Sequence, residues 1–300
     1  MNANKLTLKS YAKLNLFLKV LNLRKDNYHN LETIFERIDL HDRIILKSLP
    51  GDSIKISCNN PSVPVDSKNL CYRAALLLQK AYKVDKGVEI KIIKKIPVGS
   101  GMGGGSSNAA TTLLGLNKLW RLGASRKKLV QLAKKIGADV PFFIYDTPFA
   151  KGTKRGDEIK PLGALKDVRI WHILVVPKIH VSTPSIFKKW DSFCVKNSYL
   201  AGLTSPVSGV KILTSVIRKN ALSNVGESLF NSLEAVTISL YPEVGSIEYK
   251  LSKLGLKSIL MSGSGPAVFG VVASRKEALR LEKQLRSGST SWQAFVVRTH

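Results

Sequence analysis

Cysteine is scarce in this 300-residue sequence, which has only Cys58, Cys71 and Cys194. The three show no CxxC spacing, and an odd number of cysteines cannot all pair within one chain. The sequence therefore predicts neither a disulfide framework nor a zinc site, and it favours a reducing compartment.

Long hydrophobic runs are also missing. Although 44% of the residues are hydrophobic, no stretch approaches the roughly 18 consecutive apolar residues of a membrane-spanning helix. The first 20 residues alternate between polar and apolar side chains, unlike the continuous apolar centre of a secretory signal. We therefore expect a cytoplasmic protein without a membrane partner.

Acidic residues are few, because 21 Asp and Glu stand against 47 Lys and Arg, which gives a formal net charge of +26 at pH 7. Such a charge is compatible with binding to nucleic acid, to an anionic membrane or to anionic small molecules. The basic residues are spread along the chain without a basic tail, and helix-turn-helix, zinc and RNP signatures are absent. We expect an enzyme for anionic small molecules; a nucleic-acid-binding protein is the alternative from another class.

Length and periodicity predict two domains of mixed helices and strands. Alternating or continuous apolar residues predict strands over 14–20, 54–58, 88–92, 170–176, 258–261, 267–272 and 294–297, the first with one buried face. Three- and four-residue apolar steps or capping signals predict helices over 70–81, 109–116, 125–137, 210–217 and 228–240, and helix starts at Thr183 and Ser274. Because regular βαβ alternation is absent, we predict an α+β fold with residues 1–166 and 167–300 as its two domains.

A loop rich in glycine and serine lies between a predicted strand and a predicted helix. It consists of Pro97, Val98, Gly99, Ser100, Gly101, Met102, Gly103, Gly104, Gly105, Ser106 and Ser107. Adjacent glycines let the backbone approach a ligand closely, and a following helix adds unpaired amides and the positive end of its dipole. The loop is therefore predicted to bind a polyphosphate, with the serine hydroxyls contacting phosphate or Mg²⁺.

Two better-known phosphate motifs do not fit this loop. Gly99, Gly101 and Gly104 match G-x-G-x-x-G, but no second parallel strand with a ribose-binding acid follows. A Walker A motif needs a lysine after its last glycine, and here Gly105 is followed by two serines. A flexible linker is the other alternative, and the flanking strand and amphipathic helix argue against it.

Several motifs in a fixed order carry a resemblance to a known family. They are AKLNLFL at 12–18, NYH at 27–29, the loop with Asn108-Ala109-Ala110, GADVP at 137–141, VSTP at 181–184 with Phe187, NSLE at 231–234 and MSGSG at 261–265. In this combination the chain resembles the GHMP kinase superfamily, and within it the kinases that phosphorylate the cytidine-diphosphate ester of methylerythritol in isoprenoid precursor synthesis. The resemblance implies a two-domain fold whose active site lies between the domains. It also implies ATP as phosphoryl donor with Mg²⁺, and that diphosphate ester as the small-molecule partner.

The resemblance also implies roles for individual residues. Lys13 and Asp139 match the catalytic pair, in which Asp139 would orient or deprotonate the acceptor hydroxyl while Lys13 keeps the carboxylate ionised. The residues that match positions around the cytidine diphosphate are Asn15, Tyr28, His29, Thr183 and Phe187, and those near adenine are Asn69 and Lys94. Taken alone, Lys13 is one of many basic residues, Asp139 could be a helix cap and His29 could be a solvent-facing turn residue.

Some points stay open in the sequence. Residues 262–265 are either a second turn over the phosphates or a simple hairpin, and the stretch 149–158 is longer and more basic than the family pattern. No acidic residue stands beside the loop as an evident Mg²⁺ ligand, and either a monomer or a homodimer is compatible with the chain. Homoserine, mevalonate or a sugar is the alternative acceptor, although Tyr28, His29 and Thr183 would have no base to hold.

Overall fold

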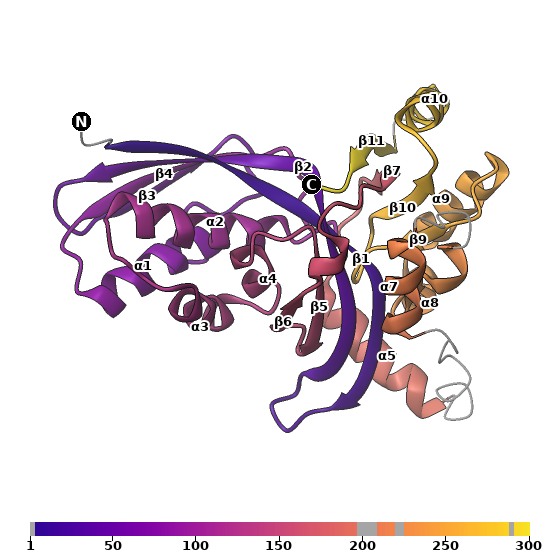
Figure 1. Cartoon of the computed structure of the whole chain (residues 1–300), viewed down its shortest axis with the longest axis horizontal. Coiled ribbons are helices and arrows are strands. Elements are labelled where there is room, and N and C mark those ends of the chain that lie inside the picture. The colour runs from indigo at the N-terminus through magenta and orange to yellow at the C-terminus, as the bar shows by residue number, and fades with distance from the viewer. Residues whose placement is uncertain (1–3, 197–208, 220–224, 288–290) are drawn as a thin grey trace.

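The computed structural model describes residues 4–196, 209–219, 225–287 and 291–300, and the side chain of Cys194 lies outside this description. The fold is α+β with two sheets and two domains, as predicted (Figure 1). Among the described helices, none combines the length and the apolar content that crossing a membrane requires.

The first sheet is built on a long hairpin of two strands. Its strands from the first half of the chain are β1 (Lys5–Leu23), β2 (His29–Leu49), β3 (Ile54–Cys58), β4 (Gly87–Ile93), β5 (Phe149–Lys154) and β6 (Glu158–Pro161). Their order is β3-β4-β2-β1, and β5 pairs with the first part of β2 and with β6. Because β2 has 21 residues, its first part contacts β5 and its last part contacts β4, so that one strand connects both ends of the sheet.

Four helices cover one side of the first sheet (Figure 1). They are α1 (Leu70–Tyr82), α2 (Gly104–Leu119), α3 (Arg126–Ile136) and α4 (Val140–Ile144). Their apolar faces bury Leu78 and Leu113 against Ile44 and Ile90 of the sheet, which is the amphipathic packing that the helical periodicity predicted. Ser125 accepts a hydrogen bond from the amide of Lys128 and caps α3, as expected.

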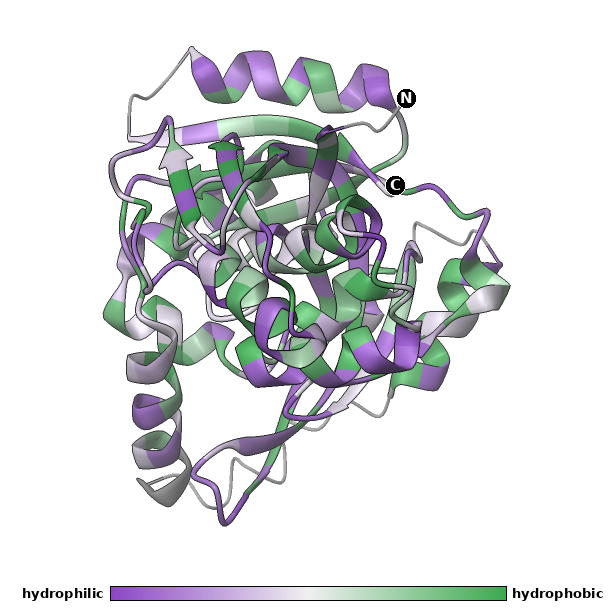
Figure 2. Ribbon diagram, turned by 90° about the vertical axis from the view of Figure 1, so that its left-hand side faces the viewer, coloured by the Kyte–Doolittle hydropathy of each residue, from purple (hydrophilic) through white to green (hydrophobic). Residues whose placement is uncertain are grey.

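The second sheet is antiparallel, with the order β11-β7-β10-β9. Its strands are β7 (Trp171–Pro177), β9 (Ile259–Met261), β10 (Val268–Val272) and β11 (Trp292–Arg298). The helices of this half are α5 (Thr183–Lys196), α7 (Val210–Arg218), α8 (Glu234–Leu240), α9 (Pro242–Lys253) and α10 (Arg275–Arg286), with 3-10 turns η1 (Gly163–Leu165) and η3 (Gly226–Ser228). Hydrophilic and hydrophobic stretches alternate along α10, the helix at the top of Figure 2, whose Leu281 and Leu285 are buried.

The two halves share part of their core. Strand β8 (Phe230–Asn231) comes from the second half but pairs in parallel with Phe17 and Leu18 of β1. The buried Glu36 of β2 lies 2.9 Å from Nε2 of His172 on β7. We propose that the domain boundary lies near Lys166, in the connection between β6 and β7.

Two secondary-structure predictions were wrong. The stretch 14–20 was expected to bury only one face of a strand. In the structure Asn15 and Phe17 are as buried as Leu14, because other elements cover both faces of β1 here. The pairing register with β2 also shifts between Asn15 and Phe17. The helix expected over 228–240 begins only at Glu234, because Phe230 and Asn231 pair with β1. Strands β2, β5 and β6 and helices α4 and α9 were not predicted.

Candidate active site

A cavity of about 800 Å³ lies between the two halves and gathers almost all of the predicted site residues. Its walls come from β1, the start of β2, the glycine loop, the segment before α4, the turn between β5 and β6, α5 and the turn at 262–265. Every predicted site residue lines it except Met102 and Ser107. Met102 is fully buried in the core shared by the halves, and Ser107 Oγ lies 2.8 Å from Ser10 Oγ, so both side chains serve packing instead of facing a ligand.

The glycine loop adopts a backbone conformation that glycine favours. Gly99, Gly101 and Gly103 have φ values of 68°, 76° and 66°. A Cβ atom on Gly101 would collide with the carbonyl oxygen of Ser262 and would lie 2.8 Å from that of Gly265. Positive φ and close approach both require glycine at this position.

The first turn of α2 leaves main-chain donors unpaired. The first intrahelical bond runs from the amide of Ser107 to the carbonyl of Gly103, so the amides of Gly104, Gly105 and Ser106 precede it. No side chain caps this helix, and its first turn holds no acidic residue. These amides and the positive end of the helix dipole lie at the cavity wall, an arrangement that binds phosphate.

A buried carboxylate, Asp42 of β2, holds both ends of the loop. Its Oδ1 accepts the amides of Lys95 and Ile96 at 2.7 and 2.9 Å, and its Oδ2 accepts Nζ of Lys94 at 2.6 Å and Nδ2 of Asn108 at 2.9 Å. Asp42 is fully buried. The residues before and after the loop are thereby fixed to one strand, which limits the positions that the loop can take.

The turn at 262–265 packs directly on the glycine loop. It connects β9 to β10 as a hairpin, and the amide of Ala267 donates to the carbonyl of Ser100 at 3.2 Å. Asn231 Nδ2 donates to the carbonyls of Met261 and Gly263, both at 2.8 Å, and thus fixes the turn. The hairpin alternative drawn from the sequence is therefore confirmed, and the same turn packs against the glycine loop. A role of the turn over bound phosphates stays a prediction.

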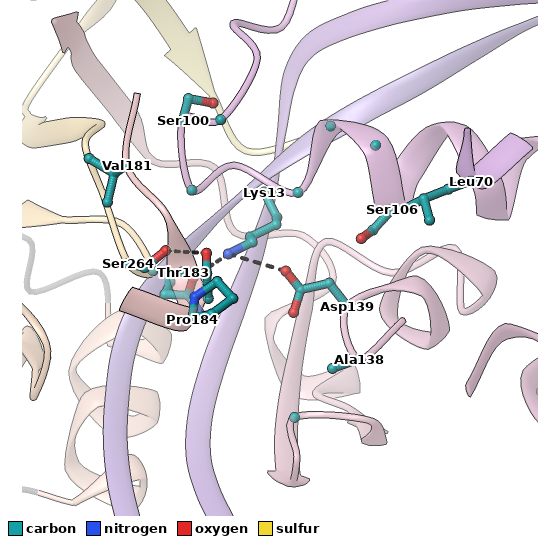
Figure 3. A pocket seen from close by; sticks show the side chains of 18 of the residues that line it. Lys13, Leu70, Ser100, Ser106, Ala138, Asp139, Val181, Thr183, Pro184 and Ser264 are labelled. Atoms are coloured by element: carbon teal, nitrogen blue, oxygen red, sulfur yellow. Dashed lines mark hydrogen bonds and ion pairs between the residues drawn. The ribbon is translucent and has the colours of Figure 1, made fainter. Parts of the chain in front are cut away.

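Lys13 and Asp139 face each other across the middle of the cavity (Figure 3). Lys13 Nζ lies 3.6 Å from Asp139 Oδ2, and the Lys13 side chain is buried while that of Asp139 is 34% exposed. Burial lowers the pKa of the Lys13 ammonium below its ordinary value, and Asp139 opposes part of this shift. Asp139 stands at the N-cap position of α4 but makes no capping hydrogen bond, so its carboxylate is available to the cavity.

Asn15 orients the lysine from two residues further along β1. Lys13 Nζ donates to Asn15 Oδ1, and Asn15 Nδ2 donates to Thr33 Oγ1 at 2.8 Å. Thr33 in turn donates to the carbonyl of Phe17 at 2.6 Å. The resemblance assigns Asn15 to the acceptor, and in the structure its carboxamide also positions the Lys13 ammonium.

Aromatic and polar groups line one end of the cavity. The His29 ring stacks on Phe187 at 5.4 Å between centroids, and its Nε2 lies 2.7 Å from Oδ1 of Asp191. His29 is only 7% exposed, so the interpretation as a solvent-facing turn residue is wrong. Tyr28 is 54% exposed and lines the cavity beside it.

At the start of α5, Thr183 Oγ1 lies 2.7 Å from Ser264 Oγ, a contact that links this end to the 262–265 turn.

The predicted adenine-site residues lie at the other end. Asn69 caps α1, because its Oδ1 accepts from the amide of Cys71 and its Nδ2 donates to the carbonyl of Pro64 at 2.6 Å. Lys94 is held by Asp42, and its side chain is 5% exposed. Both residues line the cavity, and both also make structural contacts that fix its wall.

Comparison with known proteins shows the family. The model of the GHMP kinases N terminal domain matches residues 69–147, and that of the GHMP kinases C terminal matches residues 213–289. Two relatives, each 40% identical, bear the name 4-diphosphocytidyl-2-C-methyl-D-erythritol kinase. The one from Bacillus subtilis (strain 168) matches over 93% of this chain and 92% of its own, and the one from Geobacillus thermodenitrificans over 98% and 97%.

The chain belongs to the GHMP kinase family.

Solved structures agree with this assignment. A crystal structure of 4-(cytidine 5'-diphospho)-2C-methyl-D-erythritol kinase has a TM-score of 0.80 and 30% identity, and the match covers 98% of this GHMP kinase and all of that chain. A mevalonate kinase from L. major has a TM-score of 0.77 at 16% identity over 99% of this chain and 97% of its own, which shows a shared fold alone.

Sequence reasoning missed four polar residues of this GHMP kinase: Asp42, Arg155, Asp191 and Asn231. Asp191 could have been found, because it follows Phe187 by four residues on one helix and therefore lies on the same face. Asp42 acts through contacts with residues far along the chain, and no local pattern marks it. Asn231 belongs to the NSLE motif at 231–234, but the motif did not indicate its contacts with the 262–265 turn. Arg155 lies in the stretch 149–158 that departs from the family pattern.

Proposed function

We propose that this GHMP kinase transfers the γ-phosphate of ATP to the 2-hydroxyl of 4-diphosphocytidyl-2-C-methyl-D-erythritol, a step of non-mevalonate isoprenoid precursor synthesis. The observation that carries the proposal is the aromatic end of the cavity. There His29 is fixed by Phe187 and Asp191, and Tyr28 presents an exposed ring. Relatives with this name match over nearly the whole chain at 40% identity.

The aromatic end fits a nucleobase. A ring can stack against the base, and a histidine held in one orientation can exchange a hydrogen bond with its edge. Because Asp191 engages Nε2 of His29, the other ring nitrogen remains for that purpose. Homoserine, mevalonate or a sugar contains no base that would use Tyr28, His29 and Phe187. Such an acceptor is the second candidate only because kinases for these compounds share the fold.

The opposite end fits ATP. The unpaired amides of Gly104, Gly105 and Ser106 would hold the phosphates, and Asn69 and Lys94 would lie near the adenine and ribose. Between the two ends, Asp139 would accept the proton of the acceptor hydroxyl while Lys13 stabilises the charge that develops. A lysine whose pKa is lowered by burial is thereby placed beside the reacting oxygen.

Mg²⁺ fits the site as a companion of ATP. Within the described residues there is no group of three His, Cys, Asp or Glu side chains that could hold a metal ion. The Ser106 hydroxyl and the Asp139 carboxylate line the cavity and are oxygen donors of the kind that Mg²⁺ prefers. They would hold the ion together with phosphate oxygens, and the bound ion would neutralise phosphate charge.

Because the thiols of Cys58 and Cys71 are unpaired, we place the enzyme in the reducing cytoplasm.

Product analysis tests the proposal. The pure protein is incubated with ATP, Mg²⁺ and, in separate reactions, the cytidylylated acceptor, mevalonate, homoserine or galactose, and ³¹P NMR locates the transferred phosphate. We expect a phosphate monoester at the 2-position of the cytidylylated acceptor. Faster transfer to any of the other three compounds would overturn the proposed acceptor.

A gel-shift assay with DNA and RNA at physiological salt is expected to show no binding, and tight binding would favour the nucleic-acid alternative.

A further inference from the structure

The turn between β5 and β6 brings a cation into the cavity wall. Arg155 and Gly156 line the cavity, whereas the neighbouring Lys154 does not. Lys154 pairs with Leu31 of β2, so the turn lies beside the end of the hairpin that carries Tyr28. The longer and more basic sequence of this stretch therefore places a guanidinium next to the aromatic end.

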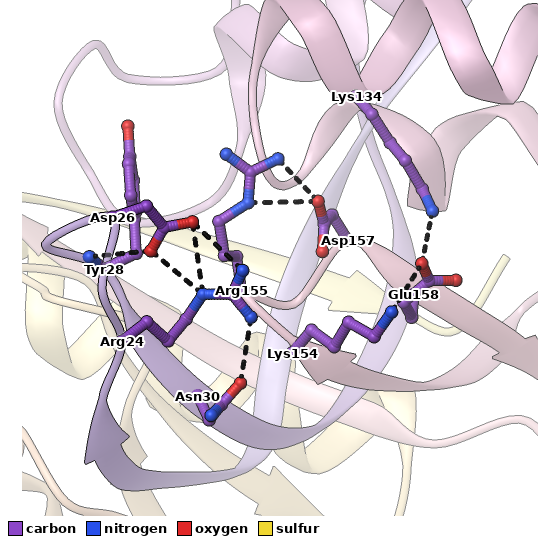
Figure 4. A network of polar contacts seen from close by, with 9 residues as sticks. All are labelled: Arg24, Asp26, Tyr28, Asn30, Lys134, Lys154, Arg155, Asp157 and Glu158. Carbon is purple, nitrogen blue, oxygen red and sulfur yellow. Dashed lines mark hydrogen bonds and ion pairs between the residues drawn. The ribbon is translucent and has the colours of Figure 1, made fainter.

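Two contacts hold this guanidinium in one orientation (Figure 4). Asp157 Oδ2 accepts from Arg155 Nε at 3.1 Å and from Nη2 at 2.6 Å, and the Asp157 side chain is 8% exposed. One face of the guanidinium lies over the ring of Tyr28, with Cζ 5.1 Å from its centroid. Nη1 donates to none of the residues that the structure describes. A rigid fork with a free edge is thereby prepared for an anion.

The turn is also linked to the helix that precedes Asp139. Lys134 of α3 pairs with Glu158 of β6 at 2.6 Å, and α3 leads directly into the segment that carries Asp139. The acceptor has its base at one end and its reacting hydroxyl at the other. Its diphosphate lies between them and carries all of its charge. Arg155 lines the cavity, lies over Tyr28 and belongs to a turn linked to α3, so it is available to this middle part.

Other cations of the cavity are already engaged or stand elsewhere. Lys13 is paired with Asp139, and Lys94 is paired with Asp42. Lys188 lines the cavity from α5 and Lys68 lines it from the segment before α1, and both are exposed. Arg155 is thus a partly buried cation with an unused donor edge near Tyr28.

We propose that Arg155 binds the diphosphate of the cytidylylated acceptor while its stacked face holds Tyr28 in place. It is a specificity-determining residue that favours nucleoside diphosphate esters over nucleosides, and Asp157 is the residue that positions it. The inference rests on the proposed function, because it presupposes that a cytidine diphosphate ester occupies this cavity.

Calorimetric binding of CDP and of cytidine tests the inference. The ATP end is first filled with a non-hydrolysable ATP mimic and Mg²⁺, so that CDP reports on the acceptor end alone. Arg155→Met keeps the apolar stem of the side chain, and Lys154→Met removes a neighbouring charge outside the cavity as the matched control. We expect Arg155→Met to bind CDP roughly 10- to 100-fold more weakly, the range of one charge-assisted hydrogen bond. Cytidine binding should change by no more than about fivefold, the range of an exposed cation–π contact, and Lys154→Met should match the wild type for both ligands.

Kinetics supply a second readout. In Arg155→Met the KM for the acceptor should rise by the same factor, while kcat and the KM for ATP stay within about twofold, and Arg155→Lys should recover part of the loss. An unchanged CDP affinity in Arg155→Met, or equal losses for CDP and cytidine, would overturn the inference while leaving the proposed function in place. A wild-type protein that binds neither CDP nor cytidine would instead overturn the proposed function, and the inference with it.

Discussion

Replacing Asp42 with asparagine should destabilise the protein strongly and weaken ATP binding. The carboxamide oxygen of the Asp42→Asn variant can still accept the two main-chain amides that now bond to Oδ1. Its amide nitrogen, however, takes the place of Oδ2, which accepts from Lys94 Nζ and Asn108 Nδ2. Donor then faces donor, and a lysine whose side chain is 5% exposed loses its counter-charge.

The magnitude follows from this burial. Removing one partner of a buried ion pair costs about 3–5 kcal/mol, a large part of the roughly 5–15 kcal/mol that stabilises a typical native protein. Lys94→Met should recover a substantial part of this loss in the double variant, because it removes the unpaired charge. The loop is also freed at both ends, so the KM for ATP should rise at least about tenfold in Asp42→Asn.

Urea unfolding followed by tryptophan fluorescence measures the first effect, and steady-state kinetics measures the second. Asp39→Asn is the matched control, because Asp39 is 37% exposed and lies 3.7 Å from the exposed Arg298, and its loss should cost no more than about 1 kcal/mol. The reasoning is refuted if Asp42→Asn unfolds like this control, or if Lys94→Met brings no recovery in the double variant.

Three further predictions concern single sites. Asp139→Asn should lower kcat by about 10²- to 10⁴-fold while calorimetric affinity for the ATP mimic holds, and near-normal turnover would remove the catalytic assignment. Gly101→Ala, which places a Cβ against the carbonyl of Ser262 at a positive φ, should raise the KM for ATP at least about tenfold, and an unchanged KM would contradict the fixed loop. Burial and the neighbouring Glu234 raise the pKa of Glu248 to about 8, so the folded protein holds a proton that the unfolded chain releases. The free energy of unfolding should therefore fall as the pH rises from about 5 to 8. In Glu248→Gln, urea unfolding should show a weaker dependence of this free energy on pH, and an unchanged dependence would contradict the raised pKa of Glu248.

Local chemistry was sufficient to predict the parts of the site that consist of contiguous residues. The glycine loop, the helix after it, the Ser125 cap and the strand at β7 each follow from spacing and residue type alone. The proposed catalytic pair is different, since Lys13 and Asp139 lie 126 positions apart in the numbering and only the family resemblance connected them. The structure then supplied the distance between the two side chains and the burial of Lys13 on which the proposed chemistry rests.

Long-range contacts explain what the sequence could not predict. Strand β2 does not show the apolar alternation of a buried strand, because Glu36 and Asp42 are polar residues in fully buried positions. Glu36 pairs with His172, and Asp42 accepts hydrogen bonds from residues that flank the glycine loop. Phe230 belongs to a strand only because β1 offers it a partner. Met102 belongs to a loop that was predicted to bind a polyphosphate, yet the tertiary fold turns its side chain into the core.

A crystal structure with a non-hydrolysable ATP mimic and the cytidylylated acceptor would show the phosphate site and the proposed catalytic pair in one complex. We expect the triphosphate against the amides of Gly104, Gly105 and Ser106, with the acceptor hydroxyl between Asp139 and the γ-phosphate. A triphosphate bound anywhere else, with these amides facing only water, would contradict this expectation.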